Sequence, residues 1–93
     1  MTEAKIQSNI VKLLEENGWF VLRLVTTNKP GIPDLQAIKN KKVIFIEVKK
    51  PSKKPTALQI HRHFELKKQG ISTIITTSTK DLAEKLSDLN ITI

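Results

Sequence analysis

The chain has 93 residues, a length that predicts one small domain over residues 1–93 with a thin hydrophobic core. Its 16 Lys and Arg against 9 Asp and Glu give a net charge of +7, which suits a polyanionic partner such as nucleic acid, although lysines also serve only to keep small domains soluble. Cysteine is absent, which excludes disulfides and thiolate metal sites and makes an intracellular protein the expectation. No apolar run exceeds four residues, so neither a membrane span nor a signal peptide is predicted.

The first half of the chain predicts one helix followed by three strands. Thr2 is suited to cap the helix and Gly18 to end it. The loop at residues 26–33 contains two prolines and a glycine. The polar pair Asn40-Lys41 is a short connection and indicates a hairpin between the second and third strands. The three strands are expected over residues 19–25, 34–39 and 42–49.

The second half predicts a basic loop, a helix, a strand and a last helix. Residues 50–55 hold three lysines and two prolines, so a mobile loop without regular structure is expected. Thr56-x-x-Gln59 has the pattern of a capping box and begins a helix that carries Leu58, Ile60, Phe64 and Leu66 and ends at Gly70. The remaining predictions are a strand over residues 71–77, a helix capped by Ser78 or Thr79 that runs through Leu89, and a short edge strand over residues 91–93.

Two carboxylates and a lysine fall within the predicted hairpin. Asp34 closes the segment Gly31-Ile-Pro-Asp, and Glu47 follows 13 residues later in an apolar run that ends at Lys49. A hairpin with this spacing would place Asp34 beside Glu47. Because an ionised group buried without a partner costs several kcal/mol, a divalent cation between the two acids is one resolution. Hard oxygen ligands, with the carbonyl of Val48 as a third, suit Mg²⁺ or Mn²⁺.

A cation in that place would support hydrolysis of a phosphodiester. It would polarise a phosphoryl oxygen and lower the pKa of a bound water. Glu47 and Lys49 share one face of the predicted strand, so the lysine would lie beside that water and could orient or deprotonate it. The alternative is that Glu47 and Lys49 form an ordinary ion pair at a solvent-exposed strand end.

These residues, in this order, resemble the VRR-Nuc branch of the PD-(D/E)XK nuclease superfamily. The resemblance rests on Gly31-Ile-Pro-Asp34, then Glu47-Val-Lys49, then Gln59 at the start of a helix, and it covers most of the chain, from Glu3 to the strand after Gly70. It implies an α/β fold with a restriction-endonuclease-like αβββαβ core, in which a central mixed sheet is flanked by helices.

The resemblance also implies a role for each matching residue. Asp34 and Glu47 would hold the metal, Lys49 would assist the water, and Gln59 would position Lys49 or the scissile phosphate. Glu3 would reach the same site through a water molecule. Two of these residues have structural alternatives, because Gln59 is also the third helical residue of a capping box and Glu3 is an acid favoured by the helix dipole.

Lys50, Lys53 and Lys54 border the proposed site and are candidates for contacts with DNA phosphates, as are Lys29 and Arg23. The alternative is that the lysine-rich loop is merely solvated. Phosphate contacts carry charge but no sequence information, so salt-dependent binding with little sequence preference is expected. His61 and His63 lie about 200° apart around a helix, so they cannot share a metal, and both are expected to be surface residues or phosphate contacts. The dispersed glycines make no phosphate-cradling loop, and no nucleotide cofactor is expected.

The leading hypothesis is therefore a Mg²⁺-dependent, structure-selective DNA endonuclease, with Mn²⁺ able to substitute. The resemblance extends this hypothesis to a four-way (Holliday) junction resolvase that acts as a homodimer and offers two sites to two opposed strands. The alternative is a non-catalytic basic α/β module that binds nucleic acid on a nuclease scaffold.

Overall fold

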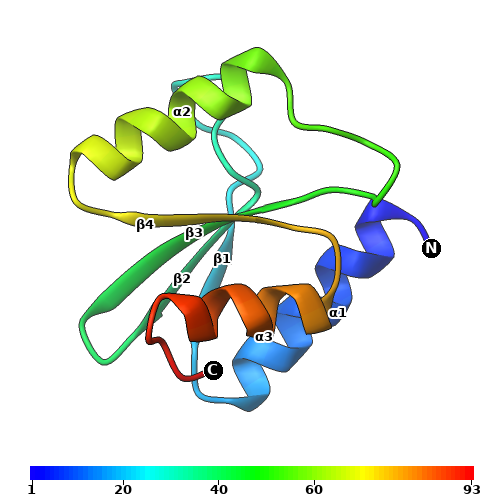
Figure 1. The fold of residues 1–93 in the computed structure, drawn as a ribbon, viewed down its shortest axis with the longest axis vertical. Coiled ribbons are helices and arrows are strands. Elements are labelled where there is room, and N and C mark those ends of the chain that lie inside the picture. Colours follow the sequence, from blue (N-terminus) through cyan, green and yellow to red (C-terminus); the bar gives the residue numbers. More distant parts are fainter.

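A four-stranded mixed sheet lies between helices, with α1 and α3 on one face and α2 on the other (Figure 1). The computed structural model describes residues 1–93. The strand order is β1-β2-β3-β4, in which β1, β2 and β3 pair antiparallel and β4 joins β3 in parallel. The predicted α/β fold with a mixed central sheet is confirmed. The elements are α1 (Glu3–Glu16), β1 (Phe20–Arg23), β2 (Leu35–Lys39), β3 (Lys42–Val48), α2 (Ala57–Lys68), β4 (Ser72–Thr76) and α3 (Thr79–Asp88).

Each helix begins at a side chain that satisfies a free backbone N–H group. The hydroxyl of Thr2 accepts from the N–H of Lys5, and the hydroxyl of Ser78 accepts from the N–H of Asp81, so Ser78 rather than Thr79 caps α3. The capping box predicted for α2 is present, with the hydroxyl of Thr56 accepting from the N–H of the third helical residue. A cap of this kind stabilises a helix by about 1 kcal/mol, which is why these starts could be read from the sequence.

The hydrophobic core lies mainly between the sheet and the pair α1 and α3. It is built from one stripe of each helix and from the side chains that β2, β3 and β4 direct to the same face: Ile6, Ile10, Val11, Leu14, Trp19, Leu35, Ala37, Ile44, Ile46, Val48, Ile74, Leu82, Leu86 and Ile91. The opposite face is covered more sparsely. Of α2, only His63 is buried, while Leu58, Ile60 and Phe64 are 40%, 53% and 57% exposed.

Two sequence-based expectations are wrong. Residues 91–93 form no strand, because Asn90 adopts a left-handed φ of 58° and Ile91 turns back to donate its N–H to the carbonyl of Leu86 and bury its side chain. His63 is not at the surface but 5% exposed, since α2 turns it toward the sheet. β1 is also shorter than expected: Trp19 leaves the strand to fill the core, and Val25 is exposed at 88%.

The other strands are shorter than expected by one residue: β2 at its start, β3 at its end and β4 at both ends. Residues 50–55 form no helix or strand, as predicted. No helix of the protein combines the length and the apolar character needed to cross a bilayer.

Candidate active site

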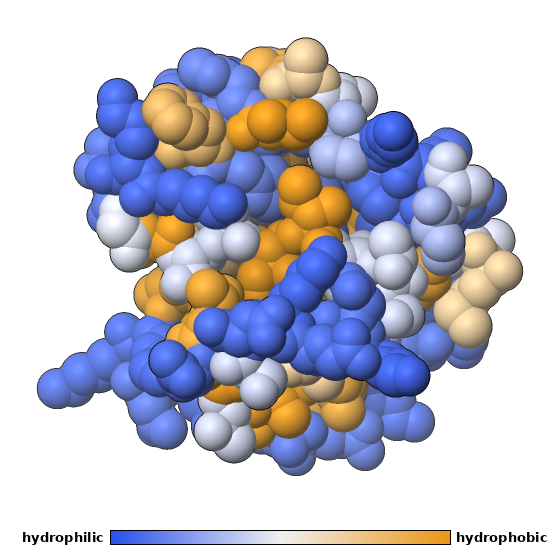
Figure 2. Space-filling model, viewed as in Figure 1, coloured by the Kyte–Doolittle hydropathy of each residue, from blue (hydrophilic) through white to orange (hydrophobic).

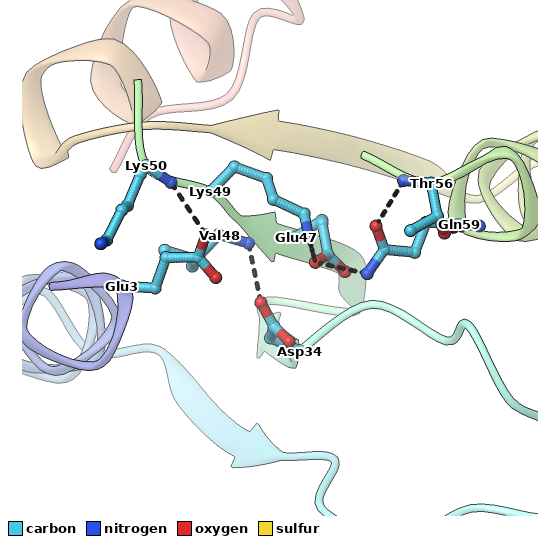
Figure 3. A network of polar contacts seen from close by, with 8 residues as sticks. All are labelled: Glu3, Asp34, Glu47, Val48, Lys49, Lys50, Thr56 and Gln59. Carbon is cyan, nitrogen blue, oxygen red and sulfur yellow. Dashed lines mark hydrogen bonds and ion pairs between the residues drawn. The ribbon is translucent and has the colours of Figure 1, made fainter. Parts of the chain in front are cut away.

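The β2–β3 hairpin brings Asp34 to the end of β3. Leu35 pairs with Ile46 in this antiparallel ladder, so the residue before β2 comes opposite Glu47. The carboxylate of Asp34 accepts a hydrogen bond from the N–H of Val48 with an Oδ2 to N distance of 2.9 Å (Figure 3). The chain thus places Asp34 against the strand end that carries Glu47, as the spacing of the two acids predicted.

Glu47 is buried, with only 2% of its side chain exposed. Its Oε2 accepts from the amide of Gln59 at 3.1 Å and faces the ammonium of Lys49 at 3.6 Å. Its Oε1 is buried and has no hydrogen-bond partner. Burial and the neighbouring Asp34 raise the pKa of Glu47 from its ordinary 4.5 to about 7. A cation between the two acids would oppose this shift, because it stabilises the ionised form of both carboxylates.

Lys49 leaves the end of β3 on the same side as Glu47, as the alternation of strand side chains predicted. Its side chain is 13% exposed, and its partner is almost fully buried. An ordinary ion pair at a solvent-exposed strand end is therefore the wrong description of these two residues. The ammonium is held at the rim of the pair of acids, within reach of a group that would approach from solvent.

Gln59 uses the two ends of its amide for different purposes. Oε1 accepts from the N–H of Thr56 at 2.8 Å and completes the capping box, while Nε2 donates to Glu47 (Figure 3). From the sequence, capping of α2 and contact with the site were alternative roles for Gln59. The structure combines both roles in this one side chain. The start of α2 is thereby joined to the acid of β3.

Glu3 reaches the same region from the start of α1. Its Oε2 accepts from the backbone N–H of Lys50 at 3.2 Å, so α1 is tied to the chain just beyond Lys49 (Figure 3). This contact gives Glu3 a structural function of its own. Whether a water molecule links it to a metal stays a prediction.

The site offers two acidic side chains for a metal, since no group of three or more His, Cys, Asp and Glu residues lies close enough to hold one. The unpartnered Oε1 of Glu47 beside Asp34 fits a cation that takes few protein ligands. Mg²⁺ is usually bound in this way, because it keeps several water ligands and takes only one or two carboxylates together with a substrate phosphate.

The basic residues proposed to contact DNA differ in their surroundings. Arg23, Lys29, Lys53 and Lys54 are exposed, whereas Lys50 is half-buried next to Glu3. One guanidinium nitrogen of Arg23 already donates to the amide oxygen of Gln7 at 2.7 Å, and that partner is neutral, so the positive charge stays available.

One residue near the site was missed by sequence reasoning. Arg62 of α2 donates through Nε to the carbonyl of Pro30, in the loop that leads to Asp34, at 2.9 Å. No sequence pattern signals this contact, because 32 residues separate its two ends.

The fold as a whole is that of a nuclease domain. A solved structure described as "VRR_NUC domain" aligns with a TM-score of 0.79 over 92% of this chain and 94% of that chain, with 27% identical residues. This similarity confirms the fold and the resemblance that the sequence suggested.

The sequence comparisons identify the family. A phage protein described as "Putative nuclease p44", from Acyrthosiphon pisum secondary endosymbiont phage 1, is 34% identical over 89 residues, which is 95% of each chain. The family described as "Archaeal holliday junction resolvase (hjc)" matches residues 4–84. The chain belongs to this Hjc family of nucleases.

Proposed function

We propose that this chain is a divalent-metal-dependent DNA endonuclease that cuts four-way junctions as a homodimer. The observation that carries the proposal is the buried Glu47 with an unpartnered oxygen, next to Asp34 and Lys49. Burying a carboxylate beside a second one lowers the free energy of unfolding, so such a pair is unexpected in a protein in which it has no function. The family description supports the junction as substrate, and the net charge of +7 supports DNA as the partner.

Asp34 and Glu47 would hold the metal together with the carbonyl of Val48, and Glu3 would contribute through water. Mg²⁺ is the proposed ion and Mn²⁺ its substitute, because both take hard oxygen ligands. When bound, the ion supplies Lewis acidity toward a phosphoryl oxygen and a lowered pKa for a water molecule.

The remaining roles belong to side chains of the chain itself. The ammonium of Lys49 is placed to donate to the attacking water or to a phosphoryl oxygen, and to offset the charge that grows as the water bonds to phosphorus and a phosphorus–oxygen ester bond breaks. Gln59 donates to one oxygen of Glu47 and so would leave the other, unpartnered oxygen for the ion.

Contacts with the DNA backbone are assigned to Arg23, Lys29, Lys50, Lys53 and Lys54. Lys50 follows Lys49 in the chain and Arg23 pairs with Leu35, the residue after Asp34, so these two would contact phosphates beside the cut. The other three lie in the loops on either side of the hairpin and would contact phosphates further away. Affinity should then fall steeply with salt and depend little on sequence.

The homodimer is supported by hydrophobic side chains left at the surface. Phe20 and Leu22 of β1 are 63% and 39% exposed, and Ile60 and Phe64 of α2 are 53% and 57% exposed. Hydrophobic atoms lie at the surface along α2 and below it on the face drawn in Figure 2. Light scattering at micromolar concentration tests the dimer, and Phe20→Glu and Phe64→Glu identify which of the two surfaces pairs. A wild-type monomer that nicks only one strand of a junction would contradict this part of the proposal.

The activity is tested with labelled four-way junction, flap, single-stranded and linear duplex DNA in Mg²⁺, Mn²⁺ or EDTA. Asp34→Asn and Lys49→Ala should abolish metal-dependent cutting, while Lys80→Ala removes an equal charge from exposed α3 and should not. Symmetric nicks confined to the junction are expected. Cutting of every duplex at the same rate would restrict the proposal to a non-selective nuclease.

A non-catalytic nucleic-acid-binding module is the alternative function. The basic composition favours it as much as it favours an enzyme, but the acid pair does not. Tight binding to all of these DNAs without cleavage in any divalent metal would make it the better description.

A further inference from the structure

One ridge of α2 carries three polar side chains at intervals of three residues. Gln59, Arg62 and Glu65 therefore lie along the same side of the helix. The first of them reaches Glu47 of β3. The second reaches a different segment, the loop between β1 and β2 that ends at Asp34.

Arg62 is committed to two protein contacts. Its Nε donates to the carbonyl of Pro30 at 2.9 Å, and a terminal nitrogen of the same guanidinium donates to Glu65 at 2.7 Å. Only 16% of its side chain is exposed. Glu65 holds a terminal nitrogen of the guanidinium from the helix side, and the Nε–H is directed at the loop.

The next residue of the loop packs on the same helix. Gly31 has a φ of +79°, and a Cβ built on it would lie 2.7 Å from Cγ of Leu58. The loop thus touches α2 at two consecutive residues, once through a hydrogen bond and once through close packing.

The segment between the anchored carbonyl of Pro30 and Asp34 is short and restrained. Three residues lie between Pro30 and Asp34, and the last of them, Pro33, is fully buried with its φ restricted by the ring. A shift of the anchored carbonyl is therefore passed on toward Asp34, because Gly31 is packed against Leu58 and Pro33 is held in the core.

We infer that Arg62 is a positioning residue that sets the place of Asp34 relative to Glu47. Helix α2 holds both acids: Gln59 holds Glu47, and Arg62 with Gly31 holds the loop of Asp34. The inference rests on the proposed function for the statement that Asp34 takes part in cleavage, but the mechanical link itself does not.

Cleavage kinetics give the first test, with Arg62→Lys, Arg62→Ala and Glu65→Gln measured in single turnover at saturating four-way junction. Because a misplacement of about 1 Å can cost about 100-fold in rate, we expect Arg62→Ala to lose about 10- to 100-fold in the saturated rate. Arg62→Lys keeps the charge but not the Nε donor, so it should lose nearly as much. Lys80→Ala, which removes an equal charge from an exposed position on α3, is the control and should cut at the wild-type rate.

Glu65→Gln separates positioning from contact with DNA. Removing a negative charge should strengthen binding to DNA if Arg62 gripped a phosphate, and cutting would not suffer. The positioning role predicts a fall in the saturated rate of about 3- to 10-fold, because the guanidinium loses its charge-assisted bond. Wild-type saturated rates in the Arg62 variants, or a loss confined to DNA affinity, would overturn the inference.

Amide chemical shifts test the link without any reference to cleavage. Arg62→Lys and Glu65→Gln should shift the amide signals of Gly31, Ile32, Asp34 and Val48 and leave those of α3 in place. If the wild type cuts no DNA but these shifts occur, the proposed function fails and the positioning stands. If the protein cuts DNA and the four signals do not respond, the positioning fails alone.

Discussion

The side chain of Gln59 joins the start of α2 to the acid of β3: its Nε2 donates to Glu47 at 3.1 Å while its Oε1 accepts from the backbone of Thr56 at 2.8 Å. One amide therefore caps a helix and orients a buried carboxylate. This coupling allows the two functions to be separated by substitution.

Thr56→Ala and Gln59→Leu should both lower stability and should differ in their effect on cleavage. Each breaks the capping box at a cost of about 1 kcal/mol in the free energy of unfolding. Only Gln59→Leu removes the donor to Glu47, so only this variant should lose cleavage rate, by at least about 10-fold. Urea denaturation and single-turnover cutting of a four-way junction measure the two effects. An equal loss of rate in both variants would mean that Gln59 acts only as a cap.

Mg²⁺ should stabilise the wild type and not Glu47→Gln. A ligand that binds only the folded state at 100 times its dissociation constant adds about 2.7 kcal/mol to the free energy of unfolding. Without metal, Glu47→Gln should be at least as stable as the wild type, because the amide removes the repulsion from Asp34 and the burial of a charge. Thermal unfolding in EDTA and in excess Mg²⁺ checks both expectations. Glu84→Gln, a change on exposed α3, should respond to Mg²⁺ as the wild type does.

His63 should contribute a loss of stability as the pH falls below 6.5, while the raised pKa of Glu47 contributes a gain over the same range. Burial, assisted by the charge of Lys67, lowers the pKa of His63 below its ordinary 6.5. The unfolded chain then binds a proton at a higher pH than the folded chain, so this contribution is complete above pH 6.5 and is lost as the pH falls through the folded-state pKa.

The control for this prediction lies two residues away. His63→Gln should remove the loss that His63 contributes between pH 7 and pH 5, so the free energy of unfolding of this variant should rise relative to that of the wild type as the pH falls. His61→Gln, at an exposed position, should keep the wild-type dependence, and the contribution of Glu47 is common to all three proteins. The other charged groups around the same cavity are Lys85 and Asp88 of α3, with Thr73 of β4 as a neutral neighbour. Denaturation curves at a series of pH values, recorded in EDTA, give the comparison. Identical slopes in the two variants would contradict the assignment to His63.

Gly31→Ala should destabilise the protein more than Gly70→Ala. Both glycines have a left-handed φ, +79° and +81°, so both substitutions incur the backbone cost of about 1–2 kcal/mol. Only at Gly31 does the new methyl group meet a neighbour, Leu58, whereas nothing lies within 4 Å at Gly70. We expect a difference of about 1 kcal/mol in the free energy of unfolding, reduced when Leu58→Ala is added. Equal effects in urea denaturation would show that Leu58 yields without cost.

The helix starts, the strands, the loops and the hairpin of this protein could be predicted from its sequence. The helices that begin after Thr2, Thr56 and Ser78 are capped by hydrogen bonds between residues three positions apart in the chain. Strands and loops are indicated by the types of neighbouring residues. The placement of Asp34 beside Glu47 was also predictable, because a two-residue connection leaves an antiparallel hairpin only one register. The resemblance to VRR-Nuc nucleases rested on these same short-range patterns.

The contacts that surround the acids were decided by the tertiary structure. The bond from Glu3 to Lys50 spans 47 residues, and that from Arg62 to Pro30 spans 32. Burial of His63 and the turn at Asn90 likewise depend on which face of an element meets the sheet. Periodicity and capping act between neighbours in the chain, so a sequence displays them directly. Which distant segments close around a carboxylate is determined only when the whole core packs, and that packing sets the raised pKa of Glu47.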